Sequence, residues 1–448
     1  MPGKGVMGEL FAATSEFTSK HMTPAARAAA AMEILSDVMR HHRPALAALA
    51  DWGRTHRFAG SGDRAAIGTI VLDALRRRAS LAWRMEDDSP RALVLGWLAF
   101  IAGHAPEEIA RFATARHGFG ALSAKERQRL AHPRALDDAP PWVRGDYPQW
   151  LHEHFTRAFG AEAVAAGQAL AQRAPLDIRV NTLLANREEA MAELARHAPQ
   201  VPPYSPWALR FHENDKGRLP HLAAELAFAR GWFEIQDEGS QIAAALCEAA
   251  PGEQVLDLCA GGGGKTLALA AMMHNEGRVI AHDAELARLS PLVERARRAG
   301  ARNIDIIPPH EKDKLRALKN GMDVVLVDAP CTGTGTWRRR PDAKWRLKPR
   351  ALERHVQAQR QLLDEAASYV RPGGRLVYVT CSVLPPENDE QARAFAQRHA
   401  GFTLKDWRGH ASLLTTLPDA PAQRLTLQLA PHRHATDGFF IAVFQREK

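Results

Sequence analysis

The sequence predicts an α/β fold whose C-terminal half is a doubly wound, mostly parallel sheet, preceded by a small α+β segment and an all-α N-terminal domain. Beyond Trp232, β-branched apolar runs alternate with helical stretches, which is the pattern of successive βαβ units. Four glycines follow the first strand candidate, at the turn where such sheets bind nucleotides. Two later runs end near Cys331 and Cys381, so both thiols are expected at the carboxyl edge of one sheet.

The first part of the chain is expected to be helical. Residues 1–22 are interpreted as a flexible extension, because the first strong helix start is Thr23-Pro24, and Met22 is an alternative start to the first methionine. Apolar residues then recur three and four positions apart, which is the spacing of amphipathic helices. The all-α domain is assigned to residues 23–140, with helices expected at 25–42, 65–85 and 90–103.

A small α+β domain is expected at 145–231, after a proline-rich boundary. It begins with a helix near 150–171 and continues as a strand, a helix and a strand, at 175–184, 187–198 and 207–211.

The remaining residues, 232–448, form the predicted sheet domain. Its parallel strands are expected at 254–259, 278–283, 303–307, 323–330 and 375–381, with helices at 267–273, 290–300 and 351–370. A late pair of apolar runs, 425–430 and 438–445, is expected to close the sheet as a hairpin.

Composition limits the class of protein. The chain has 448 residues, a formal net charge of +8 and a pI near 9.5, which suggests a polyanionic partner without establishing one. No apolar run is long enough to span a bilayer and no cleavable leader is evident, so we expect a cytosolic protein without a membrane partner. The four cysteines include no CxxC spacing, so neither a metal site nor a disulfide framework is predicted. We expect a monomer, although the sequence does not address assembly.

The glycine loop predicts a cofactor that carries adenosine. Glycines let the backbone approach a ligand closely, and the helix that follows offers its amide groups to an anion. Neither a Walker A motif nor GxGxxG fits the spacing. Asp283, at the end of the next strand, is well placed to bind ribose hydroxyls. The plainer alternative is a structural βα turn. The loop consists of Cys259, Ala260, Gly261, Gly262, Gly263, Gly264 and Lys265.

The two strand-end cysteines, together with Asp328, suggest covalent catalysis. A single cysteine at a strand end is more often a small buried apolar residue. Two of them beside an acid and a cofactor loop favour chemistry instead. A thiolate that adds to carbon 6 of a pyrimidine activates carbon 5 for methylation, and an acid stabilises the charge that develops on the ring. The attacking thiol needs a nearby cation, for which Lys265 is a candidate.

These motifs carry a resemblance to a known family. GKT in the loop, DAPCTGTG at 328–335, RRRPDAKW at 338–345 and TCSV followed by PPEN resemble the Sun/RsmB (Fmu-type) RNA cytosine-5 methyltransferases. The resemblance extends over the catalytic half from Phe233. SGDRAAIGTIVLDALRRR, at 61–78, is similar to the NusB-type RNA-binding domain of the bacterial ribosomal RNA enzymes. The resemblance to the family implies a Rossmann-like class I methyltransferase sheet, S-adenosylmethionine as cofactor and structured RNA as partner. It favours ribosomal RNA, and 16S in particular, over transfer RNA.

The resemblance also implies roles for individual residues. Cys381 would attack carbon 6, Cys331 would promote release, and Asp328 would contact the cytosine beside Lys265. The cofactor would be held by the loop 259–265 with Asp283 and Asp328.

The sequence departs from the family at two places. The usual AAPGGKT is replaced by a loop with two further glycines, and the acid expected after the third strand is absent, so Asp305 or His310 would replace it. These departures motivate an alternative function, a catalytically impaired RNA-binding factor for ribosome assembly. Methylation of a small molecule or a protein is a third reading.

A basic stretch with interleaved tryptophans predicts an RNA surface, because cations contact phosphates and aromatic rings stack on bases. The alternative is a solvated helix face with buried tryptophans. The residues assigned to RNA binding are Arg338, Arg339, Arg340, Lys344, Trp345 and Arg346.

Overall fold

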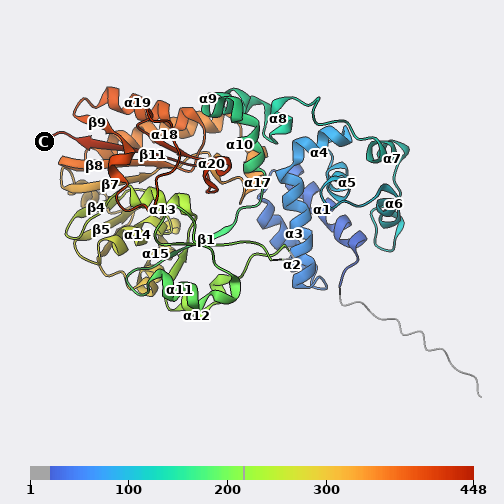
Figure 1. Cartoon of the computed structure of the whole chain (residues 1–448), viewed down its shortest axis with the longest axis horizontal. Helices are drawn as coiled ribbons and strands as arrows, with labels where there is room; N and C mark the ends of the chain where they lie inside the picture. The colour runs from blue at the N-terminus through green and yellow to red at the C-terminus, as the bar shows by residue number, and fades with distance from the viewer. Residues whose placement is uncertain (1–20, 215–216) are drawn as a thin grey trace, which may run out of the picture. The chain divides into compact units, whose positions relative to one another are not determined.

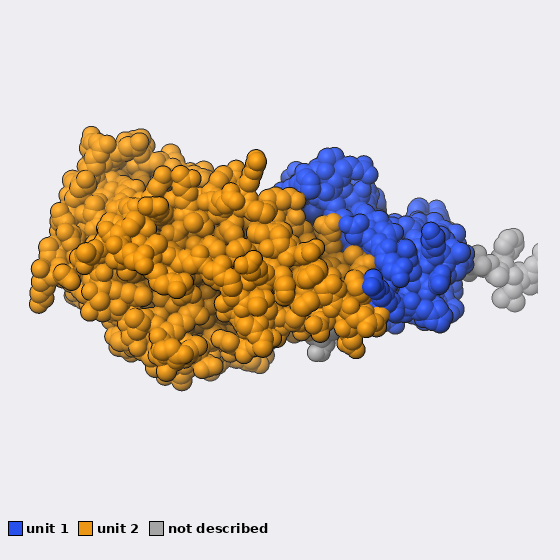
Figure 2. Space-filling view, turned by 90° about the horizontal axis from the view of Figure 1, so that it is seen from above, with its two compact units in different colours: residues 1–74, 84–134 blue, residues 75–83, 135–448 orange. Residues whose placement is uncertain are grey.

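The computed structural model describes residues 21–214 and 217–448, which divide into two compact units that Figure 2 colours separately. The first unit takes residues 1–74 and 84–134, and the second takes 75–83 and 135–448. The extension predicted at 1–22 falls almost entirely outside the described residues. Among the described residues, no helix combines the length and the hydropathy that a membrane crossing requires.

The first unit is helical, as predicted. Thr23 caps α1 by accepting the Ala26 amide, and Ser123 and Glu126 form a capping box at α7. The helix predicted over 65–85 is divided at Arg77 into α3 and α4, whose adjoining ends, 75–83, belong to the second unit. Helices α2, α6 and α7 were not predicted as separate elements. The helices are α1 Pro24–His41, α2 Ala45–Thr55, α3 Ser61–Arg76, α4 Arg78–Met85, α5 Pro90–Phe100, α6 Pro106–Thr114 and α7 Ala124–Ala131.

The second unit opens with short helices and a three-stranded antiparallel sheet of order β2-β1-β3. The strand, helix and strand predicted here are all present. The third strand, β3, was not predicted because three residues are too few to show alternation. The elements are α8 Pro141–Arg144, α9 His152–Phe159, α10 Ala163–Leu170, β1 Leu176–Val180, α11 Arg187–Glu193, β2 Ala208–Phe211, α12 Leu226–Ala229 and β3 Phe233–Ile235.

The large sheet has the order β10-β11-β8-β7-β4-β5-β6, which confirms the doubly wound fold. Neighbours from β8 to β6 are parallel, and β10 and β11 form the predicted antiparallel hairpin. A further strand, β9, pairs with β11 and was not predicted. The strands are β4 Gln254–Asp257, β5 Arg278–His282, β6 Ile304–Ile307, β7 Met322–Asp328, β8 Val370–Thr380, β9 Phe402–Lys405, β10 Leu427–Leu429 and β11 Phe439–Arg446.

Helices cover both faces of this sheet (Figure 1). Successive side chains of a strand point to opposite faces. Accordingly, Val325 and Leu376 pack with α18 and α19, whereas Val324 and Val377 pack with α13 and α14. Both faces are therefore buried, which explains the continuous apolar runs. The helices are α13 Glu238–Ala245, α14 Gly264–Met272, α15 Leu286–Ala299, α16 Lys312–Arg316, α17 Pro341–Arg346, α18 Pro349–Ala367, α19 Asp389–Arg398 and α20 Pro431–His434.

Candidate active site

The strand order places the candidate site at the carboxyl end of β4. This strand lies between β5 and β7. The connection from β4 leads to β5 and the connection from β7 leads to β8 in the opposite direction, so a crevice opens where the two connections diverge. The glycine loop follows β4, and the two cysteine-bearing loops follow β7 and β8. The three segments that the sequence singled out therefore meet at one edge.

At Gly263 of the glycine loop, both the backbone conformation and the packing exclude a larger residue. Gly263 has a left-handed φ of +81°, and a Cβ there would lie 2.1 Å from Cδ1 of Leu292 in α15. Gly261 donates its amide to Asp283 at 3.0 Å, and Arg295 donates to the carbonyl of Gly262. Side chains from α15 and the end of β5 thus fix a loop whose additional glycines would otherwise make it flexible.

A cavity of about 440 Å³ opens beside this loop. Asp257, the last residue of β4, lines it with one carboxyl oxygen bonded to Thr266 Oγ1 at 2.7 Å and the other buried without a partner among the described residues. Burial raises the pKa of Asp257 to about 7. Further lining comes from Gln236, Asp237, Cys259, Gly261, Gly262, Lys265, Asp328 and Arg339.

The two cysteines come together as the sequence predicted. Strands β7 and β8 are parallel neighbours with Asp328 opposite Val379, and the Sγ atoms of Cys331 and Cys381 lie 3.4 Å apart. Both are free and partly exposed. The hydrogen bond with Cys381, followed by burial, raises the pKa of Cys331.

Asp328 and Lys265 form an ion pair at the rim of the cavity. Lys265 Nζ lies 2.7 Å from Asp328 Oδ2, and the lysine side chain is 7% exposed while the aspartate is 32% exposed. Burial opposes the charge on Lys265, but the Asp328 carboxylate outweighs it and raises the pKa of the lysine. The site therefore holds a fixed cation beside a partly accessible carboxylate.

The comparisons with known proteins agree with this arrangement. A family model described as 16S rRNA methyltransferase RsmB/F matches residues 244–445, and one for the ferredoxin-like domain of RsmF/B-like methyltransferases matches 147–215. A probable ribosomal RNA small subunit methyltransferase B of Bacillus subtilis (strain 168) is 31% identical over 369 residues, covering 78% of this chain and 76% of the relative. The chain belongs to the RsmB/F methyltransferase family. It is also 33% identical over 307 residues to a protein of the same description from Synechocystis, where the match covers 66% of each chain.

Solved structures share the fold of this chain. The crystal structure of PH0851 superposes with a TM-score of 0.71 at 25% identity, covering 96% of this chain and 100% of that one. NSun6 from Pyrococcus horikoshii, at 24% identity and a TM-score of 0.59 over 67% of this chain and 98% of its own, shares the fold. The ferredoxin-like match falls on the segment that contains β1, α11 and β2. The NusB-type character of the N-terminal helices stays a prediction.

This RsmB/F-family protein uses S-adenosylmethionine, and the residues of the cavity fit that cofactor. The volume lies in the range of small-molecule sites. The unpartnered oxygen of Asp257 is an acceptor for a polar or cationic group of the ligand. Asp257 was not singled out from the sequence, although an acid two residues before a glycine loop is a recognisable signal.

The affinity for S-adenosylmethionine should depend on pH through Asp257. Because burial raises the pKa of Asp257 to about 7, the free protein protonates this carboxyl below that pH, and a cationic ligand favours the ionised form. We expect the affinity to be level above pH 7.5 and to fall by up to about tenfold per unit below pH 7. Below pH 7, binding of the ligand should release the proton of Asp257, and titration calorimetry in buffers of different ionisation heat would detect this release. Asp257→Asn should remove the dependence; an unchanged pH profile in this variant would contradict the assignment.

The structure modifies the predictions for the other cofactor residues. Asp283 is buried, and its oxygens accept the amides of Gly261 and Glu285, so it shapes the loop and does not line the cavity. Asp305 is 54% exposed and pairs with Arg278, the first residue of β5. It therefore lies toward the amino ends of the strands, and its assignment to the cofactor is wrong. His310 is exposed beyond the carboxyl end of β6, and its role stays a prediction.

Glu387, which the sequence reasoning missed, connects the two cysteine loops. Its buried carboxylate accepts the amide of Thr332 at 2.8 Å and Gln359 Nε2 at 3.0 Å, and both the Thr332 and Ser382 hydroxyls donate to its second oxygen. Thr332 and Ser382 each follow a cysteine directly. The acid of the PPEN segment thus sets the spacing of the two thiols, and only its place in that motif indicated a role.

Replacing Glu387 with alanine should impair catalysis through thiol placement. Loss of the shared acceptor leaves buried donors unpaired, which we expect to cost about 1–3 kcal/mol of unfolding free energy. We also expect kcat to fall by about 10- to 100-fold, as for other residues that orient catalytic groups. The KM for RNA and the affinity for S-adenosylmethionine should remain unchanged. Glu387→Gln should recover part of the loss, and Glu353→Gln, at an exposed position of α18, is the control. Equal effects on KM and kcat would contradict a positioning role.

The basic stretch is largely structural. Arg338 is buried and lies 2.9 Å from Asp437, while Arg339 pairs with both Asp437 and Asp237, the residue that caps α13. Their charges are neutralised inside the protein. The prediction that Arg338 contacts RNA is therefore wrong for this structure. Arg339 lines the cofactor cavity, where it is 34% exposed.

Lys344 is also unavailable to RNA. Its Nζ donates to the carbonyls of Arg76 at 2.7 Å and Asp146 at 2.6 Å, and burial lowers its pKa to about 7. The indole of Trp345 donates to the Leu75 carbonyl at 2.6 Å, and Arg346 pairs with Asp342. Asp342 lies within the stretch itself, but the carbonyl partners of Lys344 and Trp345 are remote in sequence, which is why the pattern suggested a surface. Exposed cations of the stretch are Arg340, Lys348, Arg350 and Arg354.

Proposed function

We propose that this RsmB/F-family protein is an RNA methyltransferase that forms 5-methylcytosine, with 16S ribosomal RNA favoured over transfer RNA. The observation that carries the proposal is the pair of thiols 3.4 Å apart, next to an Asp328 carboxylate that is bonded to Lys265. The relatives named as ribosomal RNA small subunit methyltransferase B support the choice of ribosomal RNA.

The first step is an addition to the base. Carbon 5 of cytosine is a poor nucleophile until a thiolate adds to carbon 6. In this scheme the Cys381 sulfur bonds to carbon 6 while the double bond between carbons 5 and 6 opens and its electrons move toward the ring nitrogen N3. A proton from solvent is taken up at N3 as this charge develops, and the Asp328 carboxylate accepts hydrogen bonds from the protonated N3 and the amino group. Lys265 holds this carboxylate in place and supplies a cation near the attacking sulfur.

The second step releases the product. S-adenosylmethionine supplies the methyl group for carbon 5. The Cys331 thiolate, formed when its proton passes to solvent, then takes the proton from carbon 5. That electron pair restores the double bond between carbons 5 and 6, and the bond between carbon 6 and sulfur breaks to return the thiolate of Cys381. Cys331 is proposed to promote this release from 3.4 Å away. In the free site, contact with Cys381 and then burial raise the pKa of Cys331. Bonding of the Cys381 sulfur to carbon 6 removes that contact, which favours release of the Cys331 proton in the adduct.

The function is tested with unmodified transcripts of 16S ribosomal RNA and transfer RNA, tritiated S-adenosylmethionine, and bisulfite sequencing of the products. We expect a discrete 5-methylcytosine in the ribosomal transcript. Methylation of the transfer RNA transcript alone would identify transfer RNA as the substrate instead. Saturable RNA binding without saturable heat from S-adenosylmethionine would instead favour the impaired assembly factor.

A further inference from the structure

A second cavity, of about 500 Å³, lies beside the loop that follows Cys381. Val383 and Pro385, two and four residues after this cysteine, form part of its wall, and Leu404 and Leu425 add apolar surface. The cavity is distinct from the cofactor cavity, with which it shares no lining residue. A ligand bound here would lie next to the segment that positions the attacking thiol.

Three arginines from three elements line this cavity: Arg157 of α9, Arg393 of α19, and Arg424, which precedes β10. We call the cavity the arginine pocket. One carboxylate, that of Asp389, lines it with them, so positive charge exceeds negative charge in the lining. The arrangement indicates an anionic ligand.

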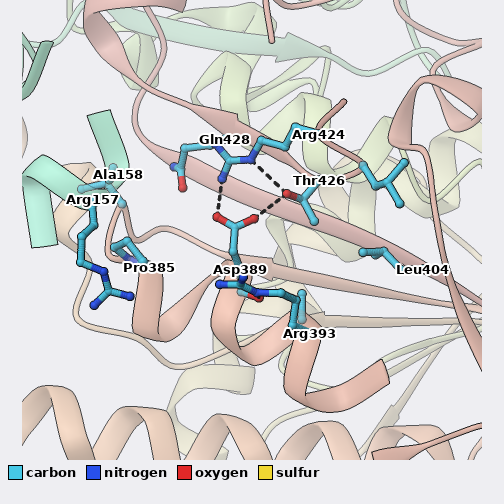
Figure 3. Close-up of a pocket in the computed structure, with 12 residues that line it drawn as sticks. Arg157, Ala158, Pro385, Asp389, Arg393, Leu404, Arg424, Thr426 and Gln428 are labelled. Carbon is cyan, nitrogen blue, oxygen red and sulfur yellow. Dashed lines mark hydrogen bonds and ion pairs between the residues drawn. The ribbon is translucent and has the colours of Figure 1, made fainter. Parts of the chain in front are cut away.

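The contacts show which arginines are free to bind it. The Asp389 carboxylate accepts from Arg424 Nη2 with one oxygen and from Thr426 Oγ1 with the other, as Figure 3 shows, so this acid is already paired. Arg157 pairs with Glu390, on the rim. Arg393 is exposed, and its Nε donates to the carbonyl oxygen of Asp389, in its own helix, at 3.3 Å. Arg393 is therefore the cation best able to accept a new anion.

Guanidinium groups bind phosphate oxygens in a forked geometry, which favours a phosphate as the ligand. The volume exceeds that of one phosphate, and the apolar wall suits the sugar attached to it. We propose that the arginine pocket binds a backbone phosphate of the RNA, adjacent to the nucleotide whose base reaches Cys381. This inference rests on the proposed function. Holding the backbone next to an extruded nucleotide would fix its register at the thiols.

The experiment measures binding of the full-length protein to fluorescein-labelled 16S transcript fragments as a function of KCl concentration. Arg393→Ala should weaken binding by about three- to tenfold at 0.1 M salt and reduce the slope of log affinity against log salt by about 0.7–1, which corresponds to one lost phosphate contact. Arg393→Glu should weaken binding further. Arg316→Ala, which changes an exposed arginine of α16 ahead of the amino end of β7, should change neither quantity.

Calorimetric affinity for S-adenosylmethionine should be unchanged in every variant, because the two cavities share no residue. Binding of the RNA by Arg393→Ala with the wild-type slope would overturn the phosphate site while leaving the proposed function intact. Absence of RNA binding by the wild-type protein would overturn both. If inorganic phosphate at constant ionic strength stabilises the wild type but not Arg393→Ala, and the RNA slope is unchanged, the pocket holds a free anion and the proposal is wrong.

Discussion

Replacing Cys331 with alanine should leave the protein covalently attached to its RNA, whereas replacing Cys381 with alanine should prevent attachment and lower turnover by at least about a thousandfold. In the proposed mechanism, Cys381 forms the bond to carbon 6 and Cys331, whose sulfur lies 3.4 Å away, promotes its cleavage. Without Cys331 the bond between Cys381 and carbon 6 forms and is not broken efficiently. A denaturing gel with labelled RNA and S-adenosylmethionine would show the adduct as a band that resists detergent.

The double variant, with both cysteines replaced by alanine, is the matched control and should form no adduct. Both cysteines are partly exposed, so thermal unfolding should change little in either single variant. An adduct in Cys381→Ala and none in Cys331→Ala would reverse the two roles. Full turnover in both single variants would exclude covalent catalysis by this pair.

Replacing Lys344 with alanine should destabilise the protein by about 3–5 kcal/mol, which is a large effect for one substitution. The change removes a fully buried side chain and leaves the carbonyls of Arg76 and Asp146 without their donor. It also removes the amine whose protonated form faces the buried Asp146 carboxyl, a group whose pKa burial raises. Denaturant unfolding at fixed pH would measure the loss. An effect below about 1 kcal/mol would place Lys344 on the surface instead.

Lys344→Met separates the amine from the volume of the side chain. Burial lowers the pKa of Lys344 to about 7, whereas a lysine in an unfolded chain titrates near 10.4. Between these values the unfolded state binds more protons, so this group makes the folded state more stable as pH rises, by up to about 1.4 kcal/mol per unit. The advantage of the wild type over Lys344→Met should therefore widen from pH 7 to 9.5. A constant difference would show that Lys344 titrates normally.

The sequence by itself determined the sheet domain and the identity of its chemical groups. The alternation of apolar runs and helices is a local property, so the five parallel strands and the closing hairpin were predictable. The positions of the glycine loop, Asp328 and both cysteines at strand ends followed from the same pattern, because parallel strands end at one edge. Elements too short to show a period, such as β3 and β9, were not predicted.

Only the tertiary structure decided which charged residues face the ligand and which are used inside the protein. Arg338 and Lys344 belong to a basic stretch of the sequence, but their partners Asp437 and Asp146 come from segments far away in the chain. Likewise, Glu387 connects two loops that begin fifty residues apart, and Arg393 and Arg157 meet at one cavity from different helices. Pairing between distant residues leaves no periodic signal in the sequence. Charge composition therefore predicted a polyanionic partner, and burial showed which cations remain to bind it.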